Sequence, residues 1–108
     1  MIDRASLTTT ATIASGDTVS GAISHKEFAT GGFRMPATFT GSSVTFQVSD
    51  DGSTYAALYN SSNAQISISV AASRCYPLPA ELMGFRFFKI VSSNAEGGDR
   101  TIGVCFKG

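Results

Sequence analysis

Apolar and polar residues alternate through the middle of the chain. From Val44 to Ser49 every second residue is apolar, and a second run with apolar positions reaches Tyr59. A period of two turns one set of side chains towards a core and the other towards water, which is typical of a half-buried β-strand. An Asp-Gly pair lies between the two runs, and glycine accepts the positive φ that tight hairpin turns require. Residues 44–59 therefore predict an antiparallel hairpin at the centre of the fold.

Further short strands are predicted on both sides of this hairpin. Residues 65–70 and 101–107 alternate in the same way, with Ile, Val or Phe at every second position. Residues 85–92 carry apolar side chains at both parities, so we expect this strand to be interior and covered on both faces. The remaining predicted strands are 7–13, 18–23, 33–35 and 74–78, and one helical turn is predicted at 79–83.

Seven or eight short strands separated by turns predict an all-β, single-domain antiparallel β-sandwich, jelly-roll-like in topology. A length of 108 residues fits one domain. An immunoglobulin-like topology would also fit the strand pattern, but the absence of tryptophan argues against a true immunoglobulin domain. We assign residues 7–108 to the sandwich and residues 1–6 to a flexible N-terminal arm.

The composition narrows the classes of partner. Charged residues make up 15% of the chain, below the roughly 25% of ordinary soluble domains, and eight basic residues balance eight acidic ones. Without a cluster of Lys and Arg, neither a nucleic-acid partner nor an anionic membrane surface is expected. No apolar stretch approaches the ~18 residues of a transmembrane helix. A surface with few charges loses little on desolvation, which suits a protein covered by protein partners.

Two cysteines, Cys75 and Cys105, are expected to be buried free thiols. The chain starts with Met-Ile-Asp-Arg and a Ser/Thr-rich run, which does not resemble a secretory signal. Folding is therefore expected in a reducing cytosol, where disulfides are rare. The sequence leaves open whether the two thiols lie close to each other.

No pattern in the chain predicts catalysis, a cofactor or a metal. Asp50 and Asp51 are expected to be hairpin residues, because the spacing of a calcium loop is missing. His25 is the single histidine and is expected in an exposed polar bend. Neither a G-x-S-x-G elbow nor a phosphate-binding loop is present. We therefore expect a protein that is not an enzyme.

Two further groups of residues have a structural and a functional interpretation. In residues 96–100 the acidic residues Glu96 and Asp99 are expected to pair with the nearby Arg100 at the surface, with the two glycines forming the bend between strands, although this loop could also bind a ligand. Tyr55, Tyr59 and Tyr76 could stack on sugar rings, or could lie at the edges of the core with their hydroxyl groups in water.

An ordered set of short motifs runs along the chain: MPA at 35–37, FTG at 39–41, VTFQVSDDGSTY at 44–55, AASRCYPLP at 71–79, GFRFFKIVS at 84–92 and RTIGV at 100–104. This set resembles small structural proteins of tailed bacteriophages. The similarity extends over residues 11–104 and consists of fold-type motifs rather than active-site motifs.

This resemblance implies a virion component made in the cytoplasm of the bacterial host. Such proteins serve as capsid decoration or cement proteins on the phage head, binding the major capsid protein as homodimers or homotrimers. The alternative is a carbohydrate- or receptor-binding module of a neck, fibre or spike. Because binding surfaces concentrate on loops and termini, we expect partner contacts at Met1, Ile2, Asp3, Arg4, Gly31, Gly32, Asn60, Asn63, Asn94, Glu96 and Asp99.

Overall fold

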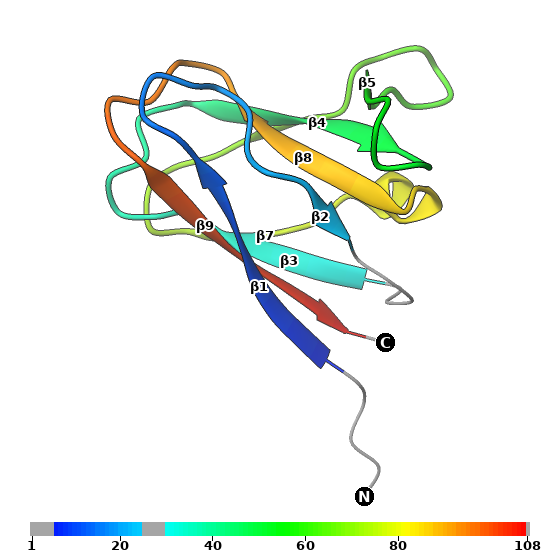
Figure 1. Cartoon of the computed structure of the whole chain (residues 1–108), viewed down its shortest axis with the longest axis horizontal. Coiled ribbons are helices and arrows are strands. Elements are labelled where there is room, and N and C mark those ends of the chain that lie inside the picture. The colour runs from blue at the N-terminus through cyan, green and yellow to red at the C-terminus, as the bar shows by residue number, and fades with distance from the viewer. Residues whose placement is uncertain (1–5, 25–29, 108) are drawn as a thin grey trace, which may run out of the picture.

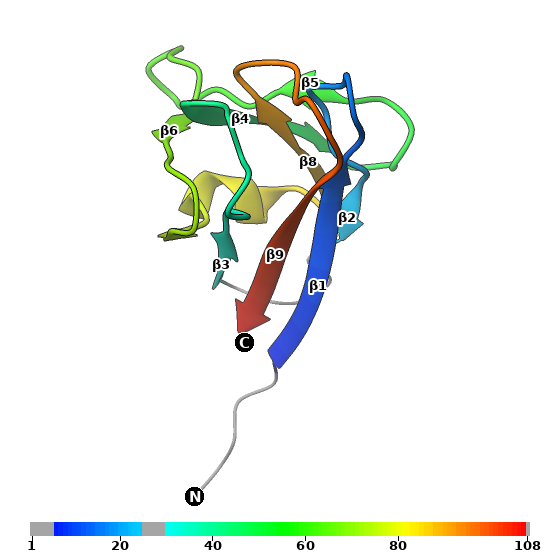
Figure 2. The same cartoon turned by 90° about the vertical axis from the view of Figure 1, so that its left-hand side faces the viewer.

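Two antiparallel sheets enclose one apolar core in the computed structural model, which describes residues 6–24 and 30–107 (Figure 1). Figure 2 shows the sheets as two layers, seen after a turn of 90°. The first sheet, called the β1 sheet, has the order β1 (Ser6–Ile13), β9 (Arg100–Lys107), β3 (Thr30–Arg34), β7 (Cys75–Pro77). The second, called the β4 sheet, has the order β2 (Ile23–Ser24), β8 (Phe87–Ser92), β4 (Ser43–Ser49). Two short strands, β5 (Ala56–Ala57) and β6 (Ser67–Ser69), both pair with the remaining edge of β4. A 3-10 helix, η1, spans Ala80–Gly84.

The strand pairing is that of a jelly roll. β1 pairs with β9, β2 with β8, β3 with β7, and β4 with β5 and β6, all antiparallel. The chain thus folds back on itself as one long hairpin whose bend lies between β4 and β6. Rolling that ribbon brings β9 beside β3 and β8 beside β4, which completes the two sheets. The predicted antiparallel sandwich with jelly-roll topology is confirmed, and residues 44–59 form the first part of the bend.

The predicted strand at residues 18–23 is present in a broken form. Its middle crosses from one sheet to the other, so it cannot pair continuously with either. Ser20 pairs with Ile13 of β1, donates its backbone N–H to the Ile90 carbonyl at 2.9 Å, and accepts the Ile90 N–H on its hydroxyl oxygen at 2.9 Å. Only β2 remains as a regular strand on β8.

Four phenylalanine rings join the two sheets through the core. Phe33 and Phe106 come from the β1 sheet, whereas Phe46 and Phe88 come from the β4 sheet. Consecutive rings meet edge to face, with centroids 6.3 Å apart for Phe33–Phe46, 6.4 Å for Phe46–Phe88 and 6.1 Å for Phe88–Phe106. This geometry places the positive edge of one ring on the negative face of the next. The inward positions predicted from the alternation of β4 and β9 are confirmed.

Residues 85–92 contain the predicted interior strand, because β8 lies between β2 and β4, but the outer face of this strand is only partly covered. Phe88 and Ile90 are buried, but Phe87 and Lys89 on the opposite face are half-buried. Instead of a third layer, cations lie on aromatic rings there. The Lys89 ammonium lies 4.3 Å from the centroid of Tyr55, and the Arg86 guanidinium lies 5.6 Å from that of Phe87.

A buried carboxylate, that of Glu96, holds one end of the sandwich together. The residue is 1% exposed. One oxygen accepts the Thr40 N–H and the Arg100 Nε–H, each at 3.0 Å. The other accepts the Thr40 hydroxyl at 3.0 Å, the Gly41 N–H at 3.1 Å and the Ser92 hydroxyl at 3.2 Å. Of the two acidic residues expected to pair with Arg100, Glu96 does so, but the pair lies inside the fold rather than at the surface.

The backbone of Glu96 adds a third segment to this junction. Its carbonyl accepts the Gly16 N–H at 2.8 Å, and its N–H donates to the Asp17 carbonyl at 3.2 Å. Burial acts to raise the pKa of the Glu96 carboxyl, but the hydrogen bonds from Thr40, Arg100 and Ser92 outweigh it, so the pKa is lowered. The carboxylate consequently remains charged and fully paired at neutral pH.

The bend after β4 is built around a second carboxylate, that of Asp51. It accepts the backbone N–H groups of Ser53 at 2.8 Å and Thr54 at 2.9 Å, and the Ser49 hydroxyl at 2.8 Å. These bonds lower the pKa of Asp51 to about 2. Gly52 has φ +79°, as the Asp-Gly pair predicts. The loop between the paired residues of β4 and β5 is longer than a two-residue turn, because Asp51 organises it as a side-chain-capped bend.

Replacing Glu96 by alanine is expected to lower the free energy of unfolding by about 3 kcal/mol, because it leaves the buried N–H of Gly41 and the part-buried donors of Thr40 and Arg100 without this acceptor. The matched control is Asp99→Ala in the same loop, whose exposed carboxylate accepts one bond, and which should lose about 1 kcal/mol or less. Urea unfolding measures both. Equal losses would contradict the role assigned to Glu96.

Acid is expected to weaken the fold through both carboxylates. Each has a lower pKa in the folded chain, so its contribution is complete above the ordinary carboxyl pKa of about 4 and is lost as the pH falls through the lowered pKa, which is about 2 for Asp51. Thermal unfolding between pH 7 and pH 2.5 measures this loss. Glu96→Gln, which cannot titrate, should be less stable at pH 7 and lose less on acidification than the unaltered chain. A variant with an unchanged pH profile would show that Glu96 does not carry the effect.

Candidate functional site

The residues predicted to contact partners lie in different parts of the fold. Met1, Ile2, Asp3 and Arg4 lie outside the described residues, as does His25. Ser6, assigned to the arm, is instead the first residue of β1 and pairs with Lys107.

The Gly31-Gly32 pair does not form a loop. Both residues lie in β3 and pair with β9, and Gly32 also pairs with Pro77 of β7. The Gly31 carbonyl accepts the Leu78 N–H at 2.9 Å. A Cβ on Gly31 would lie 2.5 Å from the Cys105 carbonyl oxygen, so glycine is needed there for the two strands to approach. The expectation that this pair forms a loop is wrong, and Gly31 serves the packing of the sheet.

The polar loops are exposed but do not meet. Asn60 accepts the backbone N–H groups of Ser62 at 2.9 Å and Ala64 at 3.0 Å, and Asn63 has φ +61°, so both residues shape the turn between β5 and β6. Asn94 and Asp99 are exposed in the loop between β8 and β9. Figures 1 and 2 show the two loops at separate places on the molecule. Glu96, in the second loop, is buried and unable to touch a partner through its side chain.

The three tyrosines do not form a common stacking platform. Tyr59 is 50% exposed, but the Tyr55 ring lies under Lys89, and the Tyr55 hydroxyl is buried without a hydrogen-bond partner. Tyr76 belongs to the other sheet, packs on Phe33 and accepts the Ala71 N–H on its hydroxyl at 2.8 Å. Two of the three rings are thus engaged within the fold.

The outer face of the β1 sheet presents a continuous array of small side chains. The register places Thr8, Thr10 and Thr12 of β1 opposite Cys105, Gly103 and Thr101 of β9. Residues opposite each other in adjacent strands share a face, so the array continues onto β3 and β7. We call this surface the threonine face; its residues are Thr8, Thr10, Thr12, Gly32, Arg34, Cys75, Thr101, Gly103 and Cys105.

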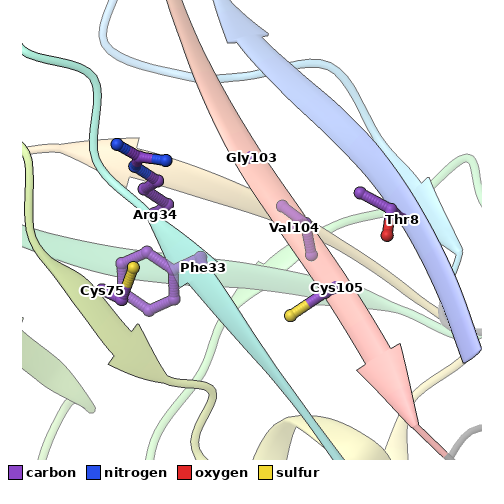
Figure 3. A pocket seen from close by; sticks show the side chains of 7 residues that line it. All are labelled: Thr8, Phe33, Arg34, Cys75, Gly103, Val104 and Cys105. Carbon is purple, nitrogen blue, oxygen red and sulfur yellow. The ribbon is translucent and has the colours of Figure 1, made fainter.

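A shallow hollow of about 300 Å³ lies in the threonine face (Figure 3). Gly103 carries no side chain, and it lies between Arg34 on one side and β1 on the other. The lining consists of Thr8, Phe33, Arg34, Cys75, Gly103, Val104 and Cys105, of which Arg34 is the one charged residue. Sequence reasoning missed this surface, although exposed threonines at every second position of residues 8–12 were a visible signal.

Both cysteines are exposed on the threonine face, so the prediction of buried thiols is wrong, whereas both are free as expected. Cys75 is opposite Arg34, and Cys105 is opposite Gly32. One strand separates them, which puts their Cα atoms about 10 Å or more apart, beyond the ~7 Å limit for a disulfide. The two thiols of one chain therefore cannot bridge.

The described residues contain no cluster of three or more His, Cys, Asp or Glu side chains placed to hold a metal ion. Within the same residues, no helix is long and apolar enough to cross a membrane.

Comparisons with known proteins bear on the fold. No protein-family model and no curated protein matches the chain. Among solved structures, the crystal structure of the SPBc2 prophage-derived protein YomS is similar, with a TM-score of 0.64 and 14% sequence identity, over 100% of this chain and 99% of that chain. At this identity the likeness concerns the fold alone, which the two chains share along their entire length.

Proposed function

We propose that the chain is a non-enzymatic structural protein of a tailed-bacteriophage virion, a capsid decoration or cement protein that docks on the major capsid protein as a homo-oligomer. The threonine face is the observation that carries this proposal. It is an exposed sheet surface of mostly uncharged side chains, with Arg34 and the adjoining Lys107 of β9 as its cations.

Physical chemistry supports docking through this face. Thr, Cys and Gly side chains have few rotamers, so they lose little entropy when a partner covers them. They also carry no charge that must be desolvated. The planar guanidinium of the exposed Arg34 can donate two parallel hydrogen bonds to a carboxylate on the partner, which would fix the partner's orientation. Modest contacts of this kind become strong when a symmetric shell repeats them.

The phage assignment draws on two independent likenesses. The motif order resembles small structural proteins of tailed phages, and the fold is shared over the full length with a prophage-derived protein. Balanced charge and the absence of a Lys/Arg cluster favour a protein partner over nucleic acid. In this proposal the chain is made in the bacterial cytoplasm and ends on the surface of the phage head.

Particle stoichiometry is the first test. Mass spectrometry of purified particles should give a molar ratio of this chain to the major capsid protein near one, or a simple fraction of it. Such a ratio follows if the chain occupies equivalent sites of the capsid lattice. A ratio of a few per cent would move the chain to a neck, fibre or spike and favour receptor binding. Complete absence from particles would refute the virion assignment.

The native thiols test which face docks. Cys75 and Cys105 are the only cysteines of the chain, and both are exposed on the threonine face. Both should react readily with a maleimide in the free protein and at least about tenfold more slowly in assembled particles, because a packed interface excludes the reagent.

A relocated thiol provides the control. The triple variant Cys75→Ser, Cys105→Ser, Ala57→Cys moves the reporter to β5, an exposed strand of the other sheet. Its thiol should react equally fast in free protein and in particles. Protection of position 57 with free reaction at 75 and 105 would place the interface on the β4 sheet and contradict docking through the threonine face.

A further inference from the structure

The free edge of β1 differs from the other sheet edges in the described part of the chain. β7 is three residues long and ends in Pro77, while β2, β5 and β6 are two or three residues long. Short strands and proline are common devices that prevent edge-to-edge pairing. β1 has eight residues, SLTTTATI, with no charge and no proline. Of these edges, β1 alone retains the length and composition of a pairing strand.

The direction of the β1 backbone groups follows from one hydrogen bond. The Thr12 carbonyl accepts the Gly21 N–H at 3.2 Å, on the side away from β9. Backbone groups alternate in direction along a strand, so those of Thr8 and Thr10 also point away from β9. The Gly21 segment covers the edge at Thr12, and no described strand covers it at residues 6–11. Thr8 and Thr10 therefore offer N–H and C=O groups to an incoming strand.

We propose that this edge pairs with the same edge of a second copy of the chain, antiparallel and about a two-fold axis near Thr9. A two-fold axis brings like residues close together, and the absence of charge in β1 means that no like charges meet. With the axis near Thr9, Thr8 of one copy lies opposite Thr10 of the other, so outward-facing residues pair with outward-facing residues. The cores of both copies therefore lie on the same side of the joined sheet. Threonines then pair across the junction, as Thr12 and Thr101 do within the chain, with hydroxyl oxygens 3.4 Å apart.

This inference rests on the homo-oligomer of the proposed function and specifies its interface. Joining two β1 sheets through their β1 edges creates one continuous sheet of eight strands from the four strands of each copy. The two threonine faces then form a single surface of doubled area. The test uses the purified chain alone, so its outcome is independent of the particle measurements.

Sedimentation velocity from about 5 to about 500 µM should show a concentration-dependent dimer. Thr10→Pro removes an N–H that points to the free edge and leaves the β1–β9 ladder intact, so the folded variant should dimerise at least about tenfold more weakly. Circular dichroism and thermal unfolding establish that the variant is folded.

A charge variant tests the same edge without altering the backbone. The double substitution Thr8→Lys, Thr10→Lys puts like charges opposite each other in any self-pairing near Thr9 and should weaken the dimer about tenfold or more, with partial recovery in high salt. The control Ala57→Lys, Ser67→Lys adds the same charge at exposed positions of the other sheet and should leave the dimer unchanged.

A chain that stays monomeric at all concentrations would overturn the inference. An oligomer that tolerates both Thr10→Pro and the lysine pair on β1 would overturn it equally, since another surface would then hold the copies together. Selective loss of the dimer in the two β1 variants, with the control unaffected, supports it.

Discussion

The carboxylate of Glu96 is the interaction on which the end of the sandwich depends. The loops β1–β2, β3–β4 and β8–β9 meet at this end of the sandwich, and Glu96, which lies in the third of them, bonds to the other two. Its backbone bonds to Gly16 and Asp17 of the first loop. Its carboxylate accepts the Thr40 and Gly41 N–H groups of the second, so one charged acceptor satisfies two backbone donors at once. The adjacent Arg100 neutralises that charge. The register of β9, and with it the threonine face, is therefore anchored at a single residue.

Much of the fold was predictable because it rests on local periodicity. Val44, Phe46 and Val48 alternate with polar residues, and each lies in the core as that alternation requires. The features that were mispredicted depend on contacts between distant segments. Gly31 was interpreted as a loop residue, but it is glycine because a Cβ there would collide with the Cys105 carbonyl. No local sequence pattern predicts such a close approach of two strands.

The candidate site was predicted less well than the fold, for reasons that can be traced to individual residues. Cys105 lies between Val104 and Phe106, which both point inward, so the alternation itself placed the thiol outward, although cysteine is usually buried. Glu96 is surrounded by Ser, Asn, Gly and Asp, a composition typical of exposed loops. Only the folded structure brings Thr40 to its carboxylate, from 56 residues away.

The pairing of β1 with β9 has a topological consequence for the boundaries of the domain. Ser6 and Lys107 are direct partners, so the chain enters and leaves the sandwich at one point (Figure 1). A domain with adjacent ends behaves as a single insert: it can be spliced into an exposed loop of another protein without stretching either chain. The same adjacency permits circular permutation, in which the old ends are joined by a short linker and new ends are opened in the turn at 60–64. The permuted chain would keep the strand pairs of both sheets and would differ only in where the chain begins and ends.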